Sequence, residues 1–295
     1  MSGHADRWDP PHLTGTTACV AGATYGVGRA IAEVLGQCGA TVYVTGRSTR
    51  TRSTKDPSWT VEHTAELVDA GGGRGVPVQT DHTSENDVRS LFEHIEGDGG
   101  LDLLVNNVWQ WGPPEKYEAP TWEQPLSRWD AMFGVGVRAQ FLTARYAIPL
   151  LLASPRSLIV STQERPGDAE HFGQNIVVDS AAIAMQRMIE HLANELADTS
   201  VTAMLLYLGW VRTVNRGMGI DLDASGISYA DFEAVTQSPY LTGRAVAALF
   251  ADQQLKARSG TTLDVGHVAL QFGFTDIDGR VRDYSGNELA QNTDL

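Results

Sequence analysis

Short apolar runs alternate with amphipathic stretches of helical length along most of the chain. The apolar runs cover residues 17–21, 41–45, 76–80, 101–105, 157–161, 201–207 and 261–265. Hydrophobic residues recur every three to four positions in the segments between them, at residues 26–39, 59–70, 84–96, 126–152 and 176–197. Apolar strands that alternate with helices are typical of a parallel sheet covered on both faces. The pattern therefore predicts an α/β fold with a doubly wound parallel sheet.

Nothing in this pattern divides the chain, so we expect one domain over residues 1–295. Residues 1–14 precede the first strand as an N-terminal arm. Residues 213–239 interrupt the alternation, and we expect them to form a lid. Residues 266–295 are rich in Gly and Asp and are expected to form a C-terminal extension over the surface or a neighbouring subunit. Pro149 is expected to disturb the end of the long helix at residues 126–152.

Composition and charge narrow the possible partners and the compartment. The 295 residues are 42% hydrophobic and 20% charged, which is ordinary for a globular protein. The net charge of −14 repels phosphate backbones and anionic lipids, so we expect neither nucleic-acid nor membrane partners. The sequence shows no apolar run long enough to span a membrane and no segment with the charged and apolar regions of a signal peptide, which predicts a cytoplasmic protein. Cys19 and Cys38 are expected as small buried hydrophobes, and the histidine spacing predicts no metal site.

A glycine-rich turn joins the first predicted strand to the first predicted helix. It reads Gly22-Ala23-Thr24-Tyr25-Gly26-Val27-Gly28. Glycines at these positions permit the tight turn and the close approach of the backbone to a pyrophosphate, while the helix N-terminus attracts the anion. Its place between a strand and a helix makes the motif specific. We therefore expect the turn, with Thr24, Tyr25 and Val27, to hold a dinucleotide in a Rossmann-type fold.

The residues after the second predicted strand indicate which dinucleotide is bound. An NAD site carries an acidic residue there, whereas this chain has Arg47 and Ser48, with Arg50 and Arg52 close by. A carboxylate would repel a 2′-phosphate, and a guanidinium can bind one with two hydrogen bonds. The sequence therefore predicts NADP(H), with Arg47 as the main contact. Arg50 and Arg52 are equally consistent with a solvated basic loop.

Together with further motifs, this turn resembles the short-chain dehydrogenase/reductase family over nearly the whole chain. The matching segments are Asp81-His82 after the third strand, Asn106-Asn107-Val108-Trp109 after the fourth, Leu208-Gly209-Trp210-Val211-Arg212-Thr213 after the sixth, and a tail at residues 272–280 similar to a bacterial subgroup. The resemblance implies an oxidoreductase. It also implies that Asp81, His82, Asn107, Gly209 and Thr213 lie at the cofactor.

The four side chains with which this family performs its chemistry have no counterparts here. The matching positions hold Gly136 for the family's Asn, Gln163 or Glu164 for its Ser, Val178 for its Tyr and Ala182 for its Lys. No Tyr or Lys occurs anywhere in residues 147–206, so a small shift of alignment does not restore them. Valine and alanine cannot donate a proton, so reduction of a carbonyl by the family's usual route is not expected.

Three functions remain open on this scaffold. The favoured one is NADP(H)-dependent hydride transfer to a small apolar metabolite whose acceptor atom is already activated, for example an iminium, which needs no general acid. The second is a non-redox cyclase or isomerase, in which NADP(H) would be structural or absent. The third is a catalytically silent binding partner.

Aromatic residues crowd the segment that borders the expected substrate site. Trp109, Trp111 and Trp210, with Val178, are expected to line a pocket for the small-molecule substrate. Trp122 and Trp129 are instead expected to pack their loop onto the core.

Three side chains are candidates for proton transfer, each beside a plainer interpretation. They are His171, which could equally be a surface-loop residue, Tyr207, which could be a buried hydrogen-bonded phenol, and Glu164, which could be a solvated acid.

The family resemblance also implies self-association through the helices at residues 126–152 and 176–197. Apolar residues in the latter, including Ile183 and Met185, lie on more than one helical face, which suits burial by both core and partner. We expect a homodimer or homotetramer.

Overall fold

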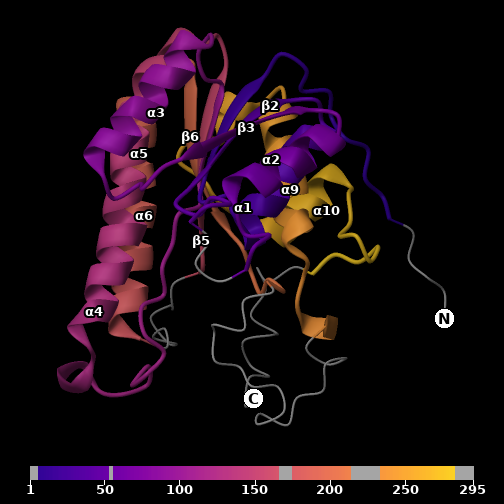
Figure 1. Ribbon diagram of the computed structural model, residues 1–295. Coiled ribbons are helices and arrows are strands. Elements are labelled where there is room, and N and C mark those ends of the chain that lie inside the picture. The colour runs from indigo at the N-terminus through magenta and orange to yellow at the C-terminus, as the bar shows by residue number, and fades with distance from the viewer. Residues whose placement is uncertain (1–5, 53–55, 166–174, 214–232, 283–295) are drawn as a thin grey trace.

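A single sheet of seven parallel strands organises the part of the chain that the computed structural model describes, namely residues 6–52, 56–165, 175–213 and 233–282. The strand order is β3-β2-β1-β4-β5-β6-β7 (Figure 1). The strands are β1 (Thr17–Ala21), β2 (Thr41–Gly46), β3 (Arg74–Gln79), β4 (Leu103–Asn106), β5 (Ser157–Gln163), β6 (Val201–Tyr207) and β7 (Thr262–Asp264). The prediction of a doubly wound parallel α/β fold is confirmed.

Helices cover both faces of this sheet. They are α1 (Gly26–Gln37), α2 (Val61–Ala70), α3 (Glu85–Gly97), α4 (Leu126–Trp129), a π-helix (Asp130–Arg138), α5 (Ala139–Ala153), α6 (Ile176–Glu195), α9 (Pro239–Ala251) and α10 (Val265–Phe272). The first face is covered by α1, α2, α9 and α10, and the other by α3, α5 and α6 (Figure 1). Each face therefore buries its own hydrophobic core.

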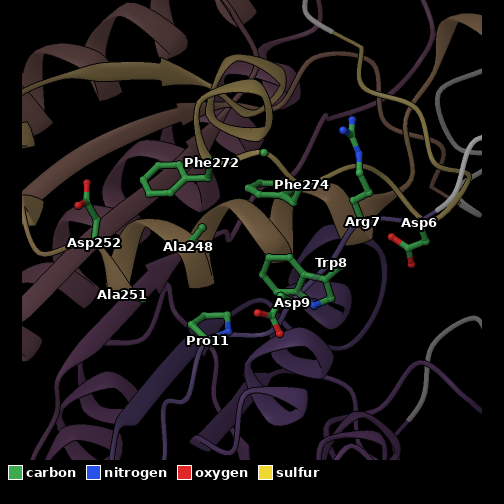
Figure 2. Close-up of a pocket in the computed structure, with 11 residues that line it drawn as sticks. Asp6, Arg7, Trp8, Asp9, Pro11, Ala248, Ala251, Asp252, Phe272 and Phe274 are labelled. Atoms are coloured by element: carbon green, nitrogen blue, oxygen red, sulfur yellow. The ribbon is translucent and has the colours of Figure 1, made fainter.

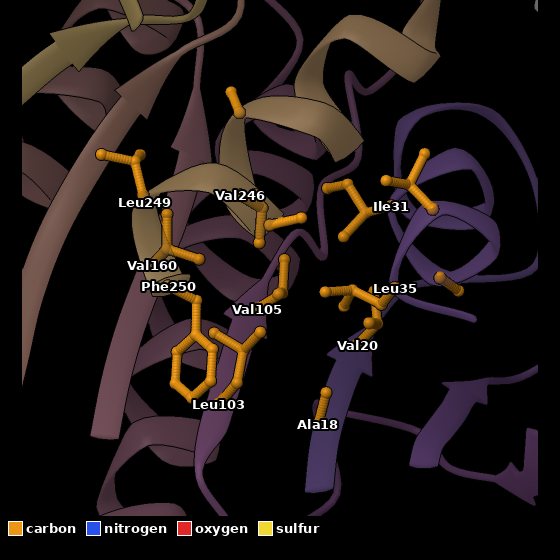
Figure 3. Packing of buried hydrophobic residues seen from close by; sticks show 14 of the residues in the cluster. Ala18, Val20, Ile31, Leu35, Leu103, Val105, Val160, Val246, Leu249 and Phe250 are labelled. Atoms are coloured by element: carbon orange, nitrogen blue, oxygen red, sulfur yellow. The ribbon is translucent and has the colours of Figure 1, made fainter. Parts of the chain in front are cut away.

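Alternate residues of each strand supply the two cores, as the two-residue period of a strand requires. In β4, Leu103 and Val105 face α1 and α9, while Leu104 faces the opposite core (Figure 3). The helices α1 and α9 approach each other closely at Gly243, where an added Cβ would lie 2.8 Å from a methyl group of Val34.

The structure differs from the expected helices in three places. The long helix at residues 126–152 is a succession of α4, a wider π-helical segment and α5, and α5 continues past Pro149 to Ala153. Helix α9 was not predicted, because its residues are buried on nearly every face and so show no amphipathic period. Helix α10 takes the first part of the segment at residues 266–295 that was expected to form a C-terminal extension over the surface.

The N-terminal arm lies against the segment that follows α10. Asp6 forms an ion pair of 2.6 Å with Arg244 of α9, and Trp8 meets Phe274 edge to face at 5.4 Å. A cavity of about 570 Å³ lies between the N-terminal arm and the ends of α9 and α10, and Phe272 contributes to its lining (Figure 2). It is lined by residues before β1 and by the C-terminal ends of α9 and α10, and so lies at the opposite end of the sheet from the glycine turn.

Only part of the predicted lid can be placed. Within residues 213–239, the structure describes residue 213 and residues 233–239, and Gln237 there is buried and forms a β-bridge with Val211. The remainder of the lid lies outside the described residues. Cys19 and Cys38 are both buried and free, as expected. None of the helices that the structure describes is long and apolar enough to cross a bilayer.

Candidate functional site

The glycine turn closes tightly between β1 and α1. Gly22 and Gly26 have φ values of +80° and +59°, the left-handed region that glycine adopts without strain. At Gly28 an added Cβ would lie 2.2 Å from the carbonyl oxygen of Gly22, so only glycine fits. Tyr25 precedes α1 and stacks on Trp59 with ring centroids 4.8 Å apart. The turn thus has the shape that a dinucleotide pyrophosphate requires.

Asn107 ties this turn to the neighbouring strands. Its amide nitrogen donates to the carbonyl oxygen of Gly22 at 3.2 Å, and its amide oxygen accepts from the hydroxyl of Thr162 at 2.8 Å. Thr213, in the loop after β6, approaches the turn at Gly26, since a Cβ added there would be 3.4 Å from the Thr213 methyl. The ends of β1, β4 and β5 and the loop after β6 therefore meet at one edge of the sheet.

Two charged residues stand beside the turn. Arg47 follows β2, is exposed, and within the described residues its guanidinium makes no hydrogen bond or ion pair, whereas Arg50 is paired with Glu66 at 2.5 Å. Burial opposes ionisation of Asp81, but two hydrogen bonds from Thr83 and the positive charge of Arg47 hold its pKa below the usual value. Arg47 is thus a cation at the end of β2 that has no side-chain partner among the described residues.

Other residues expected at the cofactor serve the protein's own packing. Thr24 is buried, and its carbonyl oxygen accepts from Arg29 at 2.6 Å. Val27 is also buried in the core. Ser48 is half-buried, and its carbonyl oxygen accepts from the amide of Val61. These three residues shape the turn and the adjoining loop.

His82 differs from its expected role. The ring is 3% exposed, and its nitrogens lie 2.8 Å from the hydroxyl of Thr45 and 2.9 Å from that of Thr143. Burial lowers the pKa of this histidine to about 4, so the ring is neutral near pH 7. The side chain therefore connects β2 to α5, and neither ring nitrogen remains free for a cofactor.

An apolar cluster contains Trp109, Trp111 and Val178, three of the residues that were expected to line the substrate pocket. Trp109 lies against Gly136, where an added Cβ would be 2.5 Å from a ring carbon of Trp109, and it meets Trp111 edge to face at 6.2 Å. The cluster consists of Met132, Val177 and Ala181, with Trp109, Trp111, Phe133, Val137 and Val178 packed against them. Ala182 is buried beside this cluster on α6. Gly136, Val178 and Ala182 thus bring no proton donor to the site.

The residues at the end of β5 are more polar than the apolar cluster around Trp109. Gln163 is buried, and its amide nitrogen has no hydrogen-bond partner among the described residues. Glu164 follows the strand and is half-buried, and burial raises its pKa to about 7. Burial and the nearby charge of Glu164 raise the pKa of Tyr117 to about 12. Sequence reasoning missed Tyr117, since a tyrosine in a polar loop has no distinguishing pattern.

A buried arginine fixes the loop that carries Tyr117. Arg128 of α4 is 0% exposed, donates to the carbonyl oxygen of Glu115 at 3.0 Å and lies 5.2 Å above the ring of Tyr117. Asn175 caps α6 and donates to the carbonyl oxygen of Tyr117 at 2.7 Å. The loop after β4 is therefore held over the ends of β4 and β5 by residues that sequence alone did not single out.

Known proteins are similar to this chain in sequence and in fold. The model of the family described as short chain dehydrogenase matches residues 16–219. The chain belongs to the short-chain dehydrogenase/reductase family. It is 33% identical to dehydrogenase/reductase SDR family member 1 of Mus musculus, over 96% of this chain and 91% of that protein, and 31% identical to the Homo sapiens protein of that name, over 92% and 87%. A short chain dehydrogenase from Burkholderia cenocepacia, solved in complex with NADP, is 25% identical, with a TM-score of 0.68 over 86% of this chain and 97% of that one.

The remaining candidates for proton transfer in this short-chain dehydrogenase/reductase are placed as follows. The hydroxyl of Tyr207 donates to the side-chain oxygen of Gln186 at 3.0 Å, and burial raises its pKa to about 12, so this phenol is anchored to α6. His171 lies outside the described residues. Among the residues that are described, no three His, Cys, Asp or Glu side chains are placed to hold a metal ion.

Two tryptophans of this family member contradict the expected packing. Trp122 is 85% exposed and Trp129 is 50% exposed, so the expectation that they pack their loop onto the core is wrong. The buried Arg128 holds the loop instead, through hydrogen bonds to the carbonyl oxygens of Pro113 and Glu115. Trp210, after Gly209 in the loop that follows β6, is about half exposed.

Proposed function

We propose that this protein is an NADP(H)-dependent oxidoreductase that acts on a small apolar substrate. The observation that carries the proposal is the intact glycine turn from Gly22 to Gly28, with Arg47 after β2 left without a partner by the residues that the structure describes. Membership of the family and the relative solved with NADP support the class of cofactor.

The residues present fit this cofactor. The turn offers backbone amides and the start of α1 to the pyrophosphate, Arg47 offers its guanidinium to the 2′-phosphate, and Asp81 offers a carboxylate that stays ionised. By their resemblance to the family's motif after the sixth strand, Thr213 and Gly209 are proposed to contact the nicotinamide. When bound, NADPH supplies a hydride. The chain's own contribution is to bind, orient and exclude water.

The apolar cluster around Trp109 indicates the substrate. Trp109, Trp111 and Val178 present a wall of aromatic and aliphatic carbon with no charge. Such a wall favours a flat or apolar molecule and keeps water from the reacting atoms. Because the wall has no proton donor, an acceptor that is already cationic, such as an iminium, suits it directly.

Calorimetric titration with NADPH and NADH tests this proposal. Removing one charge-assisted contact to a phosphate costs about 1.5–3 kcal/mol, so Arg47→Ala is expected to weaken NADPH binding by about 10- to 100-fold and to leave NADH binding unchanged. Arg50→Ala, whose guanidinium is already paired with Glu66, is the matched control and should bind NADPH as the wild type does. Equal NADPH affinity in Arg47→Ala would refute the assigned contact.

Two other outcomes would point to the other functions. Conversion of a substrate at the same rate without cofactor would indicate a cyclase or isomerase. Failure of NADPH to bind or to raise the melting temperature would indicate a silent binding partner, since a ligand of the native state must stabilise it.

We also propose that a second copy of this chain covers the outer faces of α5 and α6. Phe141 and Leu152 of α5 and Ile176 and Ile183 of α6 are each about half exposed, which leaves a large apolar area uncovered in the single chain. Burial of such an area is typical of an oligomer interface.

A further inference from the structure

One arginine of α1 ties the β2–α2 loop to the glycine turn. A terminal nitrogen of Arg29 donates to the carbonyl oxygen of Thr24 in the turn at 2.6 Å, and the same nitrogen donates to that of Ser58 in the loop. The Nε atom of Arg29 donates to the hydroxyl of Thr64 in α2 at 3.2 Å. Three segments that are separate in the sequence therefore meet on a single side chain.

Two further contacts place the same loop. The ring of Trp59 in the loop stacks on Tyr25, which precedes α1, with the ring centroids 4.8 Å apart. The amide of Val61 donates to the carbonyl oxygen of Ser48 at 3.0 Å, so the two ends of the loop are joined. Arg47 directly precedes Ser48, and its backbone is therefore placed by these contacts together with those of α1.

The contacts of Arg29 require a guanidinium. Its N–H donors lie in one rigid plane and point to several acceptors at once, whereas the ammonium of a lysine is a compact charge on a flexible stem. Arg29 is half-buried, and its three acceptors are uncharged oxygens. A half-buried side chain that donates to the backbone of both the turn and the loop fixes the separation between them.

This separation matters because NADPH carries phosphates at two places. In the proposed function, the pyrophosphate binds at the glycine turn and the 2′-phosphate binds at Arg47, and one molecule joins the two groups. Both contacts form at full strength only if the turn and the loop are held at the right separation before the cofactor arrives. NADH has no 2′-phosphate, so its binding does not depend on where the loop places Arg47.

We propose that Arg29 is a positioning residue that sets the preference of this protein for NADPH over NADH. It acts through the β2–α2 loop and through Arg47, by holding that loop against the glycine turn. The inference rests on the proposed NADP(H)-dependent function. It extends that function from the arginine that would contact the 2′-phosphate to the arginine that places the contact.

The first test follows the loop itself and needs no cofactor. Hydrogen exchange of the full-length protein is compared between the wild type and Arg29→Met, which keeps an apolar stem and removes the guanidinium. The amides of residues 57–61, including that of Val61, should exchange at least about 10-fold faster in the variant, because the loop opens locally more often. Those of α3 and α5, on the other face of the sheet, should exchange as in the wild type. Unchanged exchange at residues 57–61 would overturn the proposal.

The second test measures the preference by calorimetric titration with NADPH and NADH. Arg29→Met should weaken NADPH binding by about 10-fold, the lower end of the loss expected for Arg47→Ala, and NADH binding by less than about 2-fold. In an Arg47→Ala background, Arg29→Met should cause no further loss of NADPH affinity, because the loop then has no guanidinium to place.

Arg89→Met is the matched control. Arg89 is an exposed arginine of α3 that donates to Asn86, and its variant should match the wild type in both tests. Equal weakening of NADPH and NADH by Arg29→Met would overturn the proposal, as would losses that add to those of Arg47→Ala. A wild type that does not bind NADPH would contradict the proposed function, and the inference would fall with it. The exchange rates distinguish that case from a loop that Arg29 does not hold.

Discussion

The contact between Gly136 and Trp109 offers a sharp test of the apolar wall. An alanine at position 136 would place its Cβ 2.5 Å from one ring carbon of Trp109 and 2.7 Å from another, about 1 Å closer than ordinary contact. The indole cannot move away easily, since Trp111 and Met132 pack around it.

The size of the effect follows from two opposing contributions. Overpacking of this kind costs about 1–3 kcal/mol, and the close contact with a ring places Gly136→Ala at the upper end of that range. Replacing a helical glycine by alanine gains about 1 kcal/mol. The single variant should therefore lose about 1–2 kcal/mol of unfolding free energy. In a Trp109→Ala background the clash is absent, and Gly136→Ala should then stabilise the protein by about 1 kcal/mol.

Urea unfolding of the wild type, both single variants and the double variant measures this coupling. The difference between the two backgrounds is expected to be about 2–3 kcal/mol, with a change of sign. Gly134→Ala, in the same π-helix with nothing within 4 Å of its added Cβ, is the control and should be indifferent to Trp109→Ala. A coupling below about 0.5 kcal/mol would show that Trp109 does not lie against Gly136.

Three further predictions concern the cradle, an internal histidine and self-association. Gly28→Ala should destabilise the protein by about 3 kcal/mol in urea unfolding, because the added Cβ meets backbone that cannot give way, and an unchanged midpoint would contradict the turn geometry. The pKa of His82 is about 4 in the folded protein and 6.5 normally, so the unfolded chain binds a proton first as the pH falls. The free energy of unfolding should therefore fall by about 3 kcal/mol between pH 6.5 and 4. His82→Gln should reduce this pH dependence of stability in chemical unfolding. Light scattering should give two or four times the chain mass, and Phe141→Glu with Ile183→Glu should reduce it to one; a monomeric wild type would remove the basis for the proposed interface.

Several features of the site could be predicted from local sequence. The turn from Gly22 to Gly28 was identified because its backbone angles and close approaches are demands that only glycine meets, at spacings set by one strand and one helix. The position of Arg47 after β2 followed from the same local order. Strands such as β5 and β6 were predicted almost to the residue, because continuous runs of β-branched and aliphatic residues are a local signal.

Other features depended on neighbours far away in the chain. In the sequence, Arg128 is indistinguishable from a solvent-exposed helix residue. It is buried only because the loop that carries Tyr117 folds over it and accepts its hydrogen bonds, for example at the carbonyl oxygen of Glu115. His82 was expected at the cofactor, but the hydroxyls of Thr45 and Thr143 enclose it. Helix α9 escaped prediction because burial on nearly every face removes the period by which a helix is recognised.

By itself, the sequence determined the doubly wound sheet, the glycine turn and the absence of Tyr and Lys from residues 147–206, because periodicity, glycine geometry and residue identity are local properties. Tertiary structure alone decided that Trp109 packs against Gly136 and that Glu164 is a half-buried acid whose pKa is raised to about 7 by burial. Packing volume and the pKa of a carboxyl group depend on which atoms and how much water surround the side chain, and those surroundings come from segments that only the fold brings together.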